Sequence, residues 1–117
     1  MDKSTSYLIA ENKLVFENSE LLFDYPIKES LVMEGMLIVR LEMPFKIIYN
    51  ENVLGISLSE QKIKWRIVKR KYREQDCPFI SITQYGNFLK LFNWCGFYFI
   101  IDPITGGILE ESLPAKY

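Results

Sequence analysis

The segment FLKLFNWCGFYFIIDPITGGILEE, residues 88–111, decides the fold that we predict for this chain. It divides into three short apolar strands separated by two turns, at residues 93–96 and 102–106. The turns contain Asn, Asp, Pro and Gly, which bond to nearby backbone amides, preset φ or adopt left-handed conformations. Residues 97–101 are apolar at every position, so we expect a central strand of a sheet or a contact between subunits.

The rest of the chain carries further short segments with the period-two alternation of strands. Leu37, Val39, Leu41 and Met43 fall on one face of residues 36–43, which predicts a strand with one buried side.

Residues 62–68 alternate in the same way. Ile63, Trp65 and Ile67 are expected to face inward, with the intervening basic residues facing outward.

Weaker signals predict a hairpin from residues 7–10 and 14–16 and a strand within 18–24. A second hairpin is expected between residues 79–84 and 88–93, with Gly86 in its turn. No segment predicts a long helix. We therefore expect a single mainly-β domain, residues 1–117, of about eight to ten antiparallel strands in a small sandwich, partial barrel or propeller-like meander.

The composition of the sequence bears on the cellular compartment in which we expect the protein. No apolar stretch is long enough for a signal-peptide core or a membrane span, which predicts a cytoplasmic protein. Cys77 and Cys95 are then expected to be reduced thiols. Because the chain has no histidine and no C-x-x-C pair, we expect neither a metal site nor a cofactor.

Charge is distributed unevenly along the chain. Residues 62–73 hold seven of the 14 Lys and Arg residues and none of the 15 Asp and Glu residues. We take this basic segment as the candidate binding site, with eight residues: Lys62, Lys64, Arg66, Lys69, Arg70, Lys71, Tyr72 and Arg73. It could dock an acidic protein, follow a nucleic-acid backbone, or be a solvated strand face that discourages aggregation. Nucleic acid is the least favoured partner because the sequence pI is about 5.5.

A repeat appears when the chain is shifted by 45 residues, so that 56–65 falls over 101–110. Residues 102–109, DPITGGIL, resemble the D-P-x-T-G-x-[IV]-L turn of quinoprotein-type (PQQ-like) β-propeller repeats. Residues 56–65 resemble the companion form that ends in tryptophan. The order of segments over residues 25–111 is similar to that of small uncharacterised bacterial proteins with one or two such units.

This resemblance implies two blade-like units, at about residues 30–68 and 79–111, and brings no catalytic residues with it. The chain departs from the repeat pattern at Cys95, where aspartate is common, and at Gln61, where glycine is common. Two blades cannot close a propeller, so the sheets must bury their faces in another way.

The candidate sites in the C-terminal turns have structural explanations. Asp102 alone cannot supply the several oxygens that calcium needs, and it is expected to cap the turn that Gly106 completes. Trp94 is expected to be a packed aromatic residue. Without histidine, and without a base near Cys77, we expect no enzyme.

These observations favour a non-catalytic, cytoplasmic protein-binding module that acts without a membrane. The sharpest form of this hypothesis is a bacterial immunity protein that blocks a partner toxin. Two alternatives are a small-ligand or carbohydrate-binding domain, with Trp94, Tyr98 and Tyr85 as its platform, and an RNA-binding module that uses the basic segment.

Overall fold

The computed structural model describes residues 6–42, 51–67 and 77–112, which form eleven β-strands and no helix. The strands are β1 (Leu8–Ala10), β2 (Lys13–Val15), β3 (Glu20–Leu22), β4 (Ile27–Met33), β5 (Met36–Leu41), β6 (Val53–Ser57), β7 (Lys62–Arg66), β8 (Phe79–Tyr85), β9 (Phe88–Asn93), β10 (Tyr98–Ile101) and β11 (Ile108–Glu111). The expected mainly-β class is confirmed, with one strand more than expected. Over the same ranges, no helix could cross a membrane.

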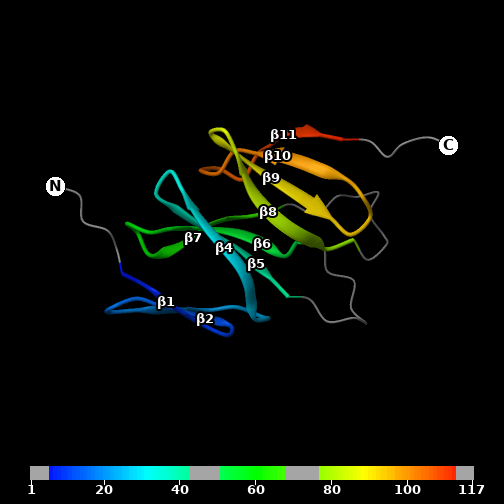
Figure 1. Ribbon diagram of the computed structural model, residues 1–117. Coiled ribbons are helices and arrows are strands. Elements are labelled where there is room, and N and C mark those ends of the chain that lie inside the picture. Colours follow the sequence, from blue (N-terminus) through cyan, green and yellow to red (C-terminus); the bar gives the residue numbers. More distant parts are fainter. Residues whose placement is uncertain (1–5, 43–50, 68–76, 113–117) are drawn as a thin grey trace.

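The strands form three open antiparallel sheets in which neighbours in sequence are neighbours in space. The N-terminal sheet is β1-β2-β3, the central sheet is β4-β5-β6-β7, and the C-terminal sheet is β8-β9-β10-β11. The three sheets are stacked as layers, with the central sheet between the other two (Figure 1). β10 lies between β9 and β11, which confirms the expectation of a central strand. The alternative, a contact between subunits, stays a prediction.

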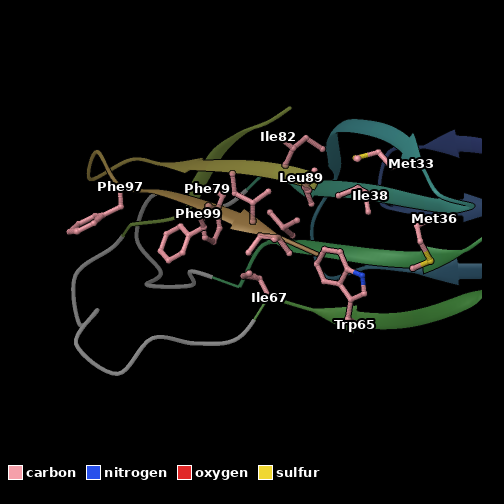
Figure 2. Close-up of a cluster of buried hydrophobic side chains, with 13 residues drawn as sticks. Met33, Met36, Ile38, Trp65, Ile67, Phe79, Ile82, Leu89, Phe97 and Phe99 are labelled. Carbon is pink, nitrogen blue, oxygen red and sulfur yellow. The ribbon is translucent and has the colours of Figure 1, made fainter. Parts of the chain in front are cut away.

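The central sheet is buried on both faces because each face meets a different sheet. Leu37, Val39 and Leu41 pack against Leu14 and Phe16 of the N-terminal sheet and the turn after it. The opposite face of the central sheet carries Met36, Ile38, Val53, Trp65 and Ile67, which pack against Phe79, Leu89, Leu91, Phe99 and Ile101 of the C-terminal sheet (Figure 2). The predicted face of β5 is confirmed as far as Leu41; Met43 lies outside the described residues.

The predicted turns form where glycine allows them. Gly86 has φ +62° between β8 and β9, and Gly106 has φ +76° before β11. The carboxylate of Asp102 accepts the amide hydrogens of Ile104 and Thr105, as its role in the turn requires. Gln61, where the repeat pattern has glycine, also adopts a positive φ of 58°.

Trp65 joins the central sheet to the C-terminal sheet. Its indole Nε1–H donates a 2.8 Å hydrogen bond to the carbonyl oxygen of Pro103, in the turn between β10 and β11. The indole lies against Gly55 and Gly106, and a Cβ atom at either glycine would overlap it. Trp65 is therefore packed against the turn that contains Pro103 and Gly106.

Strand β7 differs from its predicted alternation because of a β-bulge. Trp65 pairs with Gly55 and Ile63 pairs with Ile56, so Lys64 is an extra residue between them. A bulge shifts the residues before it to the other face. Trp65 and Ile67 are buried as expected, but Ile63 is 41% exposed, and its inward placement was wrong.

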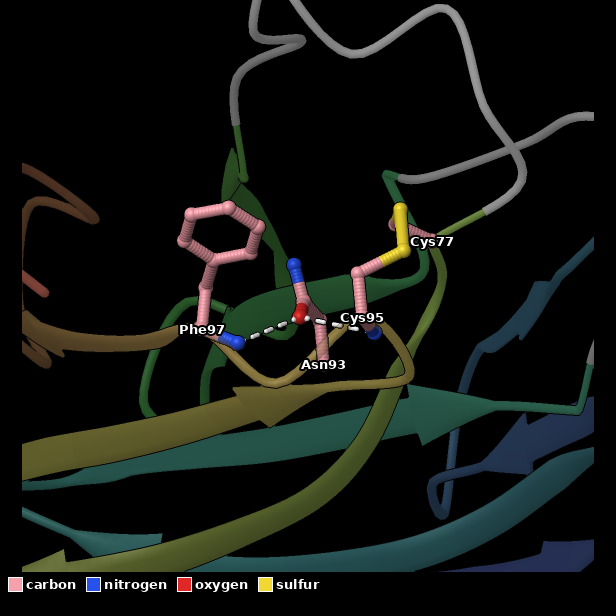
Figure 3. Close-up of a disulfide and its surroundings, with 4 residues drawn as sticks. All are labelled: Cys77, Asn93, Cys95 and Phe97. Carbon is pink, nitrogen blue, oxygen red and sulfur yellow. Dashed lines mark hydrogen bonds between the residues drawn. A yellow bond between two sulfur atoms is a disulfide. The ribbon is translucent and has the colours of Figure 1, made fainter. Parts of the chain in front are cut away.

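Cys77 and Cys95 form a disulfide, so the expectation of reduced thiols was wrong (Figure 3). The β8–β9 hairpin pairs Phe79 with Asn93, which brings the two cysteine Cα atoms to 5.4 Å. Cys77 and Cys95 are almost equally far along the sequence from the turn at Gly86. This symmetry about the turn is the sequence signal that the two cysteines lie close together.

Candidate functional site

Aromatic side chains cover the face of the C-terminal sheet that points away from the core. Leu89 and Leu91 of β9 point inward, so by alternation Phe88, Lys90 and Phe92 lie on the outer face. Register places Tyr85 of β8 beside Phe88 and Tyr98 of β10 beside Phe92. We call Tyr85, Phe88, Lys90, Phe92 and Tyr98 the aromatic face.

The aromatic face is accessible to a partner. Tyr85 is 55% exposed, Phe88 42% and Phe92 40%, whereas the leucines between the two phenylalanines are fully buried. Clusters of exposed apolar side chains are uncommon on monomers and mark interaction sites. Two hollows lined by described residues, one beside Arg40 and one beside Tyr7, include no residue of this face.

Lys90 occupies the centre of the aromatic face. Its Nζ lies 4.6 Å from the ring centroid of Tyr98 and 5.4 Å from that of Tyr85. Both distances are within the range of cation–π attraction, which holds the ammonium group among the rings. Among the described residues, no carboxylate forms an ion pair with Lys90.

The structure brings together two of the three residues predicted as a ligand platform, Tyr85 and Tyr98. Phe88, Lys90 and Phe92 were missed, although their alternation with Leu89 and Leu91 is a readable signal. Trp94 is 71% exposed, so its expected packing was wrong. The reason is that Asn93, before it, takes the inward position, where its side-chain oxygen accepts the amide hydrogens of Cys95 and Phe97 (Figure 3).

The basic segment is described only at its first three cations, which lie on β7. Lys69, Arg70, Lys71, Tyr72 and Arg73 lie outside the described residues.

The three described cations do not share one face, because of the bulge at Lys64. Lys62 pairs with Ser57 and Arg66 with Leu54, two residues of β6 that point to opposite sides. The predicted common outward face of these cations was therefore wrong.

Local partners also occupy these cations. Glu60 binds Lys64 at 2.9 Å and Lys62 at 3.6 Å. The hydrogen bond from Lys64 lowers the pKa of Glu60, and the charges of both lysines add to the effect. Arg66 donates a 2.8 Å hydrogen bond from Nε to the carbonyl of Glu51, and burial lowers its pKa.

Within the described ranges, no three Cys, Asp or Glu side chains lie close enough together to hold a metal ion.

The geometry defines the class of this protein as an all-β domain of three stacked open sheets with one aromatic outer face.

The chain belongs to the family described as Domain of unknown function (DUF7957), whose model matches residues 4–113. No curated protein matches the chain at a significant level.

Proposed function

We propose that this protein is a non-catalytic protein-binding module whose docking surface is the aromatic face. The observation that carries the proposal is the exposure of Tyr85, Phe88 and Phe92 on the outer side of a sheet whose inner side is fully packed. Protein interfaces are enriched in aromatic residues. A rigid sheet also presents these rings at little cost in entropy on binding.

A carbohydrate or other small ligand is the second candidate, because Tyr85 and Tyr98 share one face with Lys90 between them. Small-ligand sites are usually concave, whereas the outer surface of an open sheet is broad. Protein is therefore the favoured partner. RNA binding by the basic segment is disfavoured by the ion pairs of Lys62 and Lys64 with Glu60.

The narrower proposal is a bacterial immunity protein in the cytoplasm that covers the surface of a partner toxin. Small size and a docking face without catalytic groups are its support. A cytoplasmic location predicts that cellular thiols act on the Cys77–Cys95 bond. Alkylation of free thiols in rapidly quenched cells tests this location, and a pair that stays fully oxidised would contradict it.

Kinship with propeller blades also remains a proposal. Its support is that the central and C-terminal sheets are both four-stranded meanders. The contact of Trp65 with the turn at Pro103 and Gly106 adds to it.

The binding proposal is tested by co-expression with the product of the neighbouring gene. The double variant Phe88→Ser/Phe92→Ser should weaken a complex about thirtyfold or more, since central aromatic residues carry most of the energy of an interface. The matched control is Leu8→Ser/Leu22→Ser, which removes two exposed side chains of the N-terminal sheet. Equal binding by both double variants would refute docking through the aromatic face.

A further inference from the structure

Resting on the proposed function, we infer that the aromatic face recognises a protein segment that places a carboxylate on Lys90 and apolar side chains on the surrounding rings. The partner segment thus carries an acidic residue that is flanked by apolar residues.

Lys90 is the one charged side chain on the outer side of β9, the strand that runs through the aromatic face. Its register partners on that side are Thr83 of β8 and Ile100 of β10, and neither carries a charge. Glu110 follows in the same row on β11, one strand beyond Ile100, and forms no described ion pair with Lys90. The face therefore has a positive centre within a neutral ring of aromatic side chains.

The rings make this cation a selective contact. The ammonium group of Lys90 lies 4.6 Å and 5.4 Å from two ring centroids, on a side chain that is half-buried, and it has three N–H donors. A partner that covers the rings would strip the remaining water from Lys90. An apolar group above it would then leave a charge buried without a partner, which is costly, whereas a carboxylate would satisfy it.

Single-stranded nucleic acid fits this face less well, although its bases stack on aromatic rings. The C-terminal sheet offers Lys90 as a cation but carries Glu110 and Glu111 on β11. Phosphate backbones are bound by several cations acting together. A single cation therefore suits one isolated carboxylate better than a phosphate backbone.

Selection from a displayed library of random peptides tests the inference without knowledge of the natural partner. Peptides that bind the wild-type protein but not the Phe88→Ser/Phe92→Ser variant should be enriched in Asp or Glu flanked by apolar residues. Lys90→Glu should weaken the selected acidic peptides about thirtyfold or more, since it replaces a buried attraction by a repulsion. The same selection on Lys90→Glu should enrich Lys or Arg at that position, and Lys90→Met should remove the preference for charge. Lys28→Glu, an exposed lysine on β4, is the control and should bind as the wild type does.

The outcomes separate this inference from the proposed function. Peptides that need Phe88 and Phe92 but show no preference for acidic residues would overturn the inference and leave protein binding in place. No enrichment at all would count against both. A dimer, seen by light scattering and abolished by Phe92→Ser, would overturn the inference by making a second copy the occupant, and so would tighter binding of single-stranded RNA than of any peptide.

Discussion

Trp65 and Gly106 are in such close contact that a Cβ atom on Gly106 would lie 2.6 Å from the indole ring. Trp65 cannot retreat, because it is buried and its Nε1–H is bonded to Pro103. The contact joins two segments that are far apart in sequence, so its strength bears on the docking of one sheet on the other.

Gly106→Ala should lower the free energy of unfolding by about 3 kcal/mol, from overpacking against the indole and from a left-handed φ. Gly86→Ala is the matched control, because Gly86 also has a positive φ but has open space where the methyl group would go. It should cost only about 1 kcal/mol. Urea denaturation measures both, and equal losses would show that the Trp65 contact adds nothing.

Replacement by aspartate should lower the free energy of unfolding more at Asn52 than at Asn93, although both side chains are buried. The Asn52 amide donates to the carbonyls of Leu41 and Phe79, so Asn52→Asp would direct a negative charge at two carbonyl oxygens. Asn93 uses its oxygen to accept two amide hydrogens, and Asn93→Asp retains this ability.

We expect Asn52→Asp to cost about 3 kcal/mol and Asn93→Asp clearly less. Protonation of the new carboxyl at position 52 supplies a donor, so its cost should fall as the pH is lowered. Denaturant melts of both variants at neutral and acidic pH measure this difference. A loss at Asn93 as large as that at Asn52 would contradict the assigned donors and acceptors.

Reduction of the Cys77–Cys95 bond should destabilise the domain by about 3 kcal/mol, since a cross-link over a separation of 18 residues restricts the unfolded chain. Thermal melts with and without a reducing agent measure the effect. The double variant Cys77→Ser/Cys95→Ser should be insensitive to the reductant. If the wild-type protein is equally insensitive, the bond has no effect on stability.

Glu60 should titrate below the ordinary range of a glutamate, because Lys64 donates a hydrogen bond to its carboxylate and thereby lowers its pKa. A depressed folded pKa means that this pairing favours the fold above that pKa and ceases to do so as the pH falls through it. Lys64→Met should raise the pKa of Glu60 more than Lys62→Met does, as measured by NMR titration. The reverse order would contradict the 2.9 Å and 3.6 Å pairings.

Local features of the fold could be predicted because each has a local cause. Leu37, Val39 and Leu41 alternate along the chain, and Gly86 and Gly106 stand where the backbone needs a positive φ. The stacking of three layers could not be predicted, because the apolar character of Leu37 and Ile38 does not say which sheet covers each. The candidate site was found only in part. Tyr85 and Tyr98 attract notice as aromatic residues, whereas the place of Lys90 between them depends on pairings across three strands.

The burial of β5 and β6 on both faces affects how the domain unfolds. Amides of Ile38, Val39 and Leu54 lie in inner strands that are covered by a sheet above and another below. Neither outer layer can detach without exposing one face of these strands to water, which couples the release of each layer to the loss of the whole structure. Hydrogen exchange at these amides should therefore occur only through global unfolding, while the amides of β1 and β11 should exchange through local fraying.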